Sequence, residues 1–315
     1  MTTRYPILYR SVQAFALIMI LIGLAFPSLL QQWELILAVS MIVLIGIPHG
    51  ATDYLIFRHL TQPFLGTRKM SAFYLNYLLV MAAYSLLWWV SPISALLSFI
   101  VLSAYHFGQS NWNYLNTENK TLRATLYLSW GLLVTVTPIL LHFEAAQPIL
   151  TTILATSVPV LSKAFCWSLV LGILILNVWL LVYLRVSKLI ALKEFSDEWI
   201  TIALLMVAYY ALPLLLGFTI YFVFFHSLSS VMDQIQFFRK QFPTYDWRKY
   251  VKHTFPLTLA ALAGLALLVG LQWQMGIQPN VGLLFIFISI VTLPHMLLID
   301  KLYEELEVPE LHNIG

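Results

Sequence analysis

Residues 11–30 read SVQAFALIMILIGLAFPSLL, a run of 20 residues without one charged side chain. A helix of about 20 apolar residues crosses the hydrocarbon core of a bilayer, whereas the apolar part of a secretory signal is shorter. The run also lacks a cleavage site of alternating small residues. We therefore expect the first membrane span here, and not a removable signal.

Apolar stretches of similar length recur along the whole chain, separated by short polar joints. We predict spans at 11–30, 33–57, 71–90, 92–113, 122–142, 164–186, 197–212, 214–238, 255–274 and 281–300. The seventh is short, so Pro213 and Gly217 could instead mark one long helix that is kinked or broken. The joint 143–163 is apolar enough to be re-entrant or interfacial. The predicted fold is all-α: a polytopic transmembrane helical bundle of about ten spans, forming a single integral membrane domain over residues 1–315.

The composition agrees with a membrane protein and excludes other classes. Hydrophobic residues make up 60% of the chain and charged residues 10%, with a mean hydropathy of +0.84. A soluble domain carries about a quarter charged residues. The net charge of +3 is small and scattered, so we expect the lipid bilayer as partner and no nucleic acid. Cys166 is the single cysteine, which excludes an intramolecular disulfide and a thiolate metal site.

The basic residues give the predicted orientation. With these ten spans, 16 of the 17 lysines and arginines fall on one side of the membrane, and only Lys163 falls on the other. Five of them lie in the joint 239–253. Since cytoplasmic loops carry the excess of lysine and arginine, both termini are predicted to be cytoplasmic.

A few ionisable residues lie inside the predicted spans, where they cost free energy and usually have a functional reason. They are His49, Asp53, His106, His226, Asp233, His295 and Asp300. The four histidines lie on the second, fourth, eighth and tenth spans, which all run from outside to inside. At 1.5 Å per residue, counting back from the next basic residue places the rings of His49, His226 and His295 about 13, 20 and 9 Å from the cytoplasmic face. Four parallel helices can therefore bring the four rings together inside the bundle.

Imidazole is a common ligand for first-row transition metals, and its second nitrogen is usually held by a neighbouring acceptor. Asp53 follows His49 by four residues, so one helical turn would place its carboxylate on the same face, where it could orient a ligand ring. The alternative for each histidine is a hydrogen-bonded packing residue. For all four together, a shared metal site is the better interpretation, because four separate burial costs would otherwise need four separate causes.

The local sequences around the histidines strengthen this hypothesis. Proline precedes two of them, in Pro48-His49 and in Pro294-His295, and removes a helical hydrogen bond that would otherwise form. The third lies in His106-Phe107-Gly108, where glycine permits a close helix approach or a bound ligand. The alternative for each pair alone is ordinary packing within a span.

In these motifs the chain resembles the bacterial Brp/Blh-type β-carotene cleavage dioxygenases. The resemblance covers most of the chain and depends on four ordered motifs. These are Pro48-His49-Gly50-Ala51 with Asp53, His106-Phe107-Gly108, His226-Ser227, and Leu293-Pro294-His295-Met296.

The resemblance implies a multi-pass protein of the inner (plasma) membrane that cleaves the central double bond of β-carotene with O2 to give two retinals. It implies Fe(2+) as cofactor, with His49, His106 and His226 as ligands and catalytic residues, and His295 as a further ligand or close neighbour. A retinal-binding rhodopsin would be a functional partner. Aromatic residues including Trp88, Trp89, Phe222, Phe224 and Phe225 could line a slot for the polyene, although most aromatic residues in spans serve packing or the interface.

The chain departs from the family pattern at three positions. Family members usually carry a second histidine four residues after the third motif histidine, where this chain has Ser230. The acidic residues usual after the His-Phe-Gly motif are Gln109 and Asn111 here. We expect Asp53 and Ser230 beside the ligands and not among them. His295 or a water then completes the site, or the metal affinity is lower.

Several other functions also place histidines inside a membrane bundle. A transporter or proton relay would use histidine and aspartate on a path, but it predicts inverted repeats and paired broken helices, and the sequence has one break, near Pro213. A bis-haem cytochrome needs paired histidines on one helix, a di-iron hydroxylase needs clustered histidine motifs, and an opsin needs a lysine in a late span. The main alternative is a carotenoid-binding or transport protein that has lost full metal ligation. A structural or chaperone role would follow if no metal binds.

Overall fold

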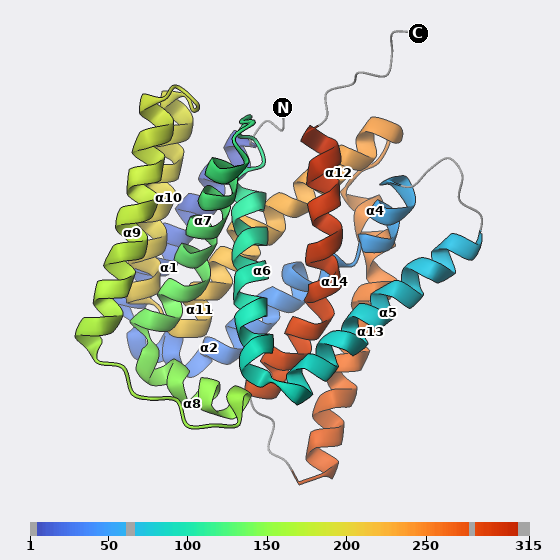
Figure 1. Ribbon diagram of the computed structural model, residues 1–315, viewed down its shortest axis with the longest axis horizontal. Helices are drawn as coiled ribbons and strands as arrows, with labels where there is room; N and C mark the ends of the chain where they lie inside the picture. Colours follow the sequence, from blue (N-terminus) through green and yellow to red (C-terminus); the bar gives the residue numbers. More distant parts are fainter. Residues whose placement is uncertain (1–4, 61–66, 277–280, 308–315) are drawn as a thin grey trace. The chain divides into compact units, whose positions relative to one another are not determined.

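The computed structural model describes residues 5–60, 67–276 and 281–307, and Figure 1 shows that these residues form helices joined by short loops. The helices are α1 (Pro6–Ala25), α2 (Pro27–Met41), η1 (Ile42–Gly46), α3 (Ile47–Gly50), α4 (Asp53–Leu60), α5 (Thr67–Val90), α6 (Pro92–Trp112), α7 (Lys120–Leu141), α8 (Phe143–Leu154), α9 (Lys163–Val186), α10 (Leu192–Ala211), α11 (Leu214–Thr219), η2 (Ile220–Ser227), α12 (Leu228–Gln241), α13 (Trp247–Gln274) and α14 (Val281–Glu307). Within these ranges there is no strand, which confirms the all-α prediction.

Nine helical stretches of the described chain are long and apolar enough to cross a bilayer, which confirms a polytopic bundle of about ten spans. The predicted seventh span corresponds to α10, a helix of 20 residues that carries Lys193, Glu194, Asp197 and Glu198 in its first two turns. Because of these four charges, α10 is less apolar than the nine stretches and is not one of them. After α10 the backbone is extended at Leu212 and Pro213, so α10 and α11 are separate helices. The orientation of the termini stays a prediction.

The boundary between the first two spans was predicted wrongly. The apolar run 11–30 is not one helix, because α1 ends at Ala25 and Phe26 leaves the helical region with φ −136° and ψ 57°. Pro27 then occupies the first position of α2, where its missing N–H costs nothing. Hydrophobicity alone hid this break, since Phe26 and Leu29 are as apolar as the residues around them.

The helices group into two compact units, each built from several segments of the chain. The prediction that residues 1–315 form one membrane domain stays a prediction. Unit 1 comprises 1–46, 100–148 and 158–233. In it α7 packs against α9, and α10 packs against α1, α7 and α9. Its apolar core is centred on Tyr127, Trp130, Leu133, Leu184 and Leu205, each no more than 1% exposed.

Two glycines allow α6 and α7 to approach closely in unit 1. A Cβ at Gly108 would collide with the backbone of Tyr127, and a Cβ at Gly131 would collide with the backbone of Ala104. Small residues at such crossings are the usual means of close packing between membrane helices. The glycine after His106-Phe107 therefore serves helix packing and places this part of α6 directly against α7.

Gly108→Ala is expected to lower the melting temperature of the purified protein, because the new methyl group meets backbone that cannot rotate away. Overpacking of this kind typically costs about 1–3 kcal/mol. Gly172→Ala in α9 is the matched control, since nothing lies within 4 Å of a Cβ there. The control should leave the melting temperature unchanged or raise it, because alanine favours a helix over glycine. An equal loss in both variants would contradict the close-packing role.

Unit 2 comprises 47–99, 149–157 and 234–315, of which the structure describes the ranges given above. Here α14 packs against α4 and α5, and α13 packs against α3. Trp88 of α5 donates its indole N–H to Ser289 Oγ at 2.9 Å and meets Phe285 edge-on. These contacts join α5 to α14, the two helices that hold the side chains described below.

The joint 143–163 contains α8, a helix of 12 residues. A helix of that length is too short to span a bilayer, so it is compatible with a joint between two spans. At the start of α9, Lys163 pairs with Glu144 at 3.2 Å, and both side chains are exposed. Whether α8 is interfacial or re-entrant stays a prediction.

Candidate functional site

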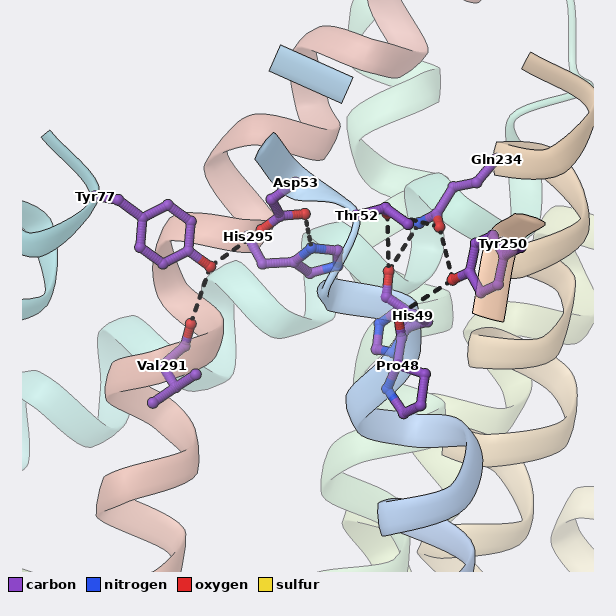
Figure 2. A network of polar contacts seen from close by, with 9 residues as sticks. All are labelled: Pro48, His49, Thr52, Asp53, Tyr77, Gln234, Tyr250, Val291 and His295. Carbon is purple, nitrogen blue, oxygen red and sulfur yellow. Dashed lines mark hydrogen bonds and ion pairs between the residues drawn. The ribbon is translucent and has the colours of Figure 1, made fainter. Parts of the chain in front are cut away.

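The helix that carries His49 is interrupted directly after it. α3 ends at Gly50 and α4 begins at Asp53, so the regular helical pattern of hydrogen bonds is interrupted here. Pro48 O accepts the Ala51 N–H at 3.2 Å and the Tyr250 O–H at 3.2 Å, and Gln234 Nε2 donates to His49 O at 3.0 Å. The Thr52 hydroxyl is also 3.3 Å from His49 O (Figure 2). Because non-helical backbone at membrane depth must be satisfied internally, these bonds fix the backbone of His49.

Asp53 connects this segment to α14 and α5. Its Oδ1 lies 2.7 Å from His295 Nδ1, and its Oδ2 accepts a hydrogen bond of 3.0 Å from Tyr77 O–H. The His295 ring in turn meets the His49 ring edge-on, with ring centres 4.9 Å apart and an interplanar angle of 87° (Figure 2 shows both rings). His49, Asp53 and His295 are each no more than 4% exposed.

We expected Asp53 to follow His49 by one helical turn and to orient a ligand ring. The structure interrupts the helix at residues 51–52, and the carboxylate of Asp53 holds the ring of His295, which also contacts His49. Metal-binding histidines are usually held by a carboxylate at the ring nitrogen that does not bind the metal, and the contact between Asp53 and His295 Nδ1 is of this kind.

The other two histidines form a similar pair in unit 1. The rings of His106 and His226 have centres 5.0 Å apart at 74°, and both residues are no more than 4% exposed. Phe107 meets His226 edge-on at 4.7 Å, and Phe222 stacks on it at 5.9 Å. The pair is thus enclosed by aromatic side chains, with Phe222 from the predicted polyene slot among them.

Wide helical turns occur near both His49 and His226. The π-helix η1 ends three residues before His49, and the π-helix η2 contains His226. The two π-helical segments contact each other within unit 1, and Ser227 Oγ donates to Phe222 O, five residues earlier, at 2.8 Å. π-turns are rare and occur frequently at functional sites. They change which residues share a face, and no local sequence pattern predicted them.

One of the positions that departs from the family pattern contacts a buried carboxylate. Glu198 of α10 is 0% exposed and accepts hydrogen bonds from Asn111 Nδ2 at 3.3 and 3.4 Å and from Tyr114 O–H at 3.1 Å. Asn111, which stands where family members usually carry an acid, thus lies beside an acid from another helix. Sequence analysis placed Glu198 at a span end and did not single it out.

A small cavity of about 50 Å³ borders His226 in unit 1, together with Tyr9, Asn111, Asn113 and Asp233. Asp233 accepts a hydrogen bond from Asn113 Nδ2 at 3.1 Å. A cavity of this size has room for water beside the polar side chains, since one water needs about 10–15 Å³ of such space. The in-span carboxylate of Asp233 is thus explained by a polar contact beside the histidine pair.

The two histidine pairs fit a first-row metal ion as far as their own geometry goes. Two imidazoles on one ion, each at a metal–nitrogen distance of about 2.0–2.1 Å, have ring centres roughly 5 Å apart. Both pairs have that separation. No group of three or more histidine, cysteine, aspartate or glutamate side chains at metal-binding distance occurs among the described residues. Convergence of all four histidines on one ion stays a prediction.

Sequence analysis missed four residues of these networks: Tyr77, Gln234, Tyr250 and Glu198. Tyr77, Gln234 and Tyr250 appeared as ordinary span residues, since a neutral side chain in a helix carries no pattern that shows its partner. The useful signal was the Pro48-His49-Gly50 sequence, because a predicted helix break requires donors from elsewhere. Of the other predicted slot residues, Trp88 bonds Ser289, whereas Trp89 is 83% exposed.

The described helices and buried rings define a class of protein: an integral membrane protein with histidine pairs inside an apolar helical bundle. Comparison with known proteins identifies the family. The chain belongs to the beta-carotene 15,15'-dioxygenase family, whose model matches residues 40–303 and so includes all four histidines. This confirms the resemblance seen in the motifs.

A curated relative agrees with this assignment. The chain is 27% identical over 276 residues to the beta-carotene 15,15'-dioxygenase of uncultured marine bacterium 66A03. The match covers 84% of this chain and 93% of the relative. No solved structure matches the chain.

Proposed function

We propose that this protein cleaves the central 15,15' double bond of β-carotene with O2 and releases two molecules of retinal. The proposal includes iron(II) held by His49, His106, His226 and His295. The observation that carries it is the pair of buried, edge-on histidine contacts at the family's motif positions. Bound iron(II) would supply the activation of O2.

The side chains of the protein would orient the iron ligands and provide an apolar environment for the substrate. Asp53 and Tyr77 hold the His295 ring, and Gln234 holds the backbone of His49. Phe107 and Phe222 make one side of His226 apolar, which suits a polyene. The reaction forms two carbonyl groups, each with one oxygen atom of O2, so it needs no external proton or reductant.

A second function remains in view because of one position. Ser230 is 3% exposed where the family usually has histidine, and a hydroxyl group is a poor iron ligand. A chain with incomplete ligation would bind or transport a carotenoid without cleaving it. The location would be the plasma membrane in either case, and with cleavage a retinal-binding rhodopsin would be the user of the product.

Expression in a β-carotene-accumulating bacterial host tests the proposal. We expect the cells to lose β-carotene and to accumulate retinal under air but not without oxygen, and the purified protein to contain iron. Retinal is measured by chromatography of cell extracts and iron by elemental analysis. Bound β-carotene with neither iron nor retinal would support the carotenoid-binding alternative instead.

Tyr77→Phe and Asp53→Asn are expected to weaken iron binding while the helices remain folded. Replacing groups that hold a ligand ring typically costs about 10–100-fold in metal affinity, and Asp53 holds His295 directly while Tyr77 holds Asp53. The affinity is measured by equilibrium titration of the metal-free protein with iron(II) under anaerobic conditions.

Tyr84→Phe provides the matched control on the same helix. Tyr84 is buried and donates its O–H to Ala95 O at 2.7 Å, so the same group and a hydrogen bond are lost, away from the histidines. Iron affinity should stay as in the wild type. If Tyr84→Phe weakens iron binding as much as Tyr77→Phe, the role assigned to Tyr77 is only structural.

A further inference from the structure

Unit 2 contains a second cavity that plays no part in the proposed reaction. It has a volume of about 460 Å³, roughly three times the 150 Å³ that holds a benzene molecule. Its walls come from α4, from the end of α12, from the joint 242–246 and from the first turns of α13. The lining residues are Leu55, Arg58, Phe238, Phe242, Thr244, Tyr245, Lys249, Lys252 and His253.

The charged groups that line this cavity are all of one sign. Arg58, Lys249 and Lys252 contribute three cations, and no carboxylate is among the lining residues. The nearest acid in sequence, Asp246, is not part of the lining, and its side chain accepts the Lys249 backbone N–H at 2.9 Å and caps α13. Burial, with Tyr54 and Asp246 nearby, raises the pKa of Tyr245 to about 12, so its phenol adds no negative charge at neutral pH.

The rest of the lining is mainly apolar. Leu55 and Phe238 are buried, whereas Phe242 is 50% exposed at the rim. Tyr245 is fixed on three sides: its ring packs on Phe238, its O–H lies 3.1 Å from His253 Nδ1, and its carbonyl accepts from Arg239 Nε at 2.7 Å. A ligand for this cavity must therefore combine an anionic group with an apolar chain.

We propose that this cavity binds one anionic phospholipid, with its phosphate between Arg58, Lys249 and Lys252 and an acyl chain against Leu55, Phe238 and Phe242. Basic pockets between membrane helices bind such headgroups, and each lysine or arginine near a charged membrane surface contributes about 1 kcal/mol. The half-exposed Trp247 beside the cavity is typical of the interface between headgroups and acyl chains. The lipid would contact α4, the helix that starts at Asp53, and α13.

Native mass spectrometry of the purified full-length protein tests this site. Phosphatidylglycerol and phosphatidylcholine are titrated into the detergent micelles, and the dissociation constant of the first retained lipid is compared. Phosphatidylglycerol should bind more tightly. The double variant Lys249→Gln/Lys252→Gln should bind it roughly 30-fold more weakly, the equivalent of about 2 kcal/mol for two charges.

Lys240→Gln/Arg248→Gln is the control, because it removes the same charge from the same region without touching the cavity lining. It should change the dissociation constant less than threefold. Equal losses in both double variants would mean diffuse attraction and overturn the proposal, as would equal binding of the two lipids.

Two further measurements distinguish a bound lipid from a bound free phosphate. Phe242→Ser should weaken phosphatidylglycerol binding, because the acyl chain loses an apolar contact at the rim. Soluble glycerol 3-phosphate should bind far more weakly than the lipid; equal affinity would indicate a site for free phosphate and overturn the assignment. Melting temperatures in phosphatidylcholine show whether each variant is folded. If the lysine variants unfold, the proposal is still tested by the comparison of the two lipids in the wild type and by Phe242→Ser.

Discussion

His49→Ala is expected to abolish iron binding and retinal production together, while the protein stays folded. Loss of an imidazole ligand should lower iron affinity by more than the roughly 100-fold upper range for groups that only orient a ligand. The fold should survive because Gln234 and Thr52 hold the backbone carbonyl of His49, and alanine has the same carbonyl. The measurements are iron per protein, retinal per cell and melting temperature for wild type and variant.

His142→Ala is the appropriate control for this prediction. His142 follows α7, and its Nε2 lies 2.7 Å from the carbonyl oxygen of Tyr209, so it is a histidine with a structural contact within unit 1. Its replacement should cost stability and leave the iron content per folded protein unchanged. Retention of iron and activity in His49→Ala would remove His49 from the metal site and leave the histidine pairs as packing contacts.

The sequence predicted the helices and the buried histidines because both depend on local chemistry. A run such as 281–300 is apolar over a span length whatever its neighbours are, and a histidine in such a run is noticed immediately. The histidine pairs themselves are tertiary. His49 and His295 lie 246 positions apart along the chain, and their contact depends on how α3 and α14 pack.

Departures from regular helix geometry were the main source of error. The expected helical turn between His49 and Asp53 assumed an unbroken helix, whereas the structure interrupts the helix at residues 51–52, with both side chains in contact with His295. The motif contained the warning, since Pro48 and Gly50 both weaken a helix. The π-helical turns gave no such warning, because their cause lies in packing and not in residue type.

Polar residues with neutral side chains could not be assigned from the sequence. Gln234 is 0% exposed and bonds both Thr52 and the His49 carbonyl, yet it lies at the polar end of a predicted span where glutamine is ordinary. Glu198 was overlooked for a related reason, because it lies at the start of the predicted span 197–212, next to the charges of the preceding joint. In both cases the burial, which only the fold shows, identifies the residue as important.

Ser230→His is expected to raise the iron affinity of the protein, and retinal production with it. Ser230 lies in α12, four residues after His226 and about one helical turn away, and is 3% exposed. A histidine there would add a third imidazole to the unit that already holds His106 and His226. An additional ligand should increase affinity by at least tenfold, although the larger side chain costs about 1–3 kcal/mol of stability if the site is tightly packed.

Ser168→His separates ligation from the general effect of adding a histidine. Ser168 lies in α9, where its side chain is exposed and donates to Phe165 O at 2.7 Å. We expect more iron and more retinal with Ser230→His and neither with Ser168→His. The wild type could already hold one iron per chain, with Ser230→His changing neither the iron affinity nor the retinal yield. In that case His295 completes the ligand set, and serine at position 230 does not weaken the metal site. If Ser230→His increases iron without retinal, the metal site is intact but the chain has lost the ability to cleave, which favours the carotenoid-binding alternative.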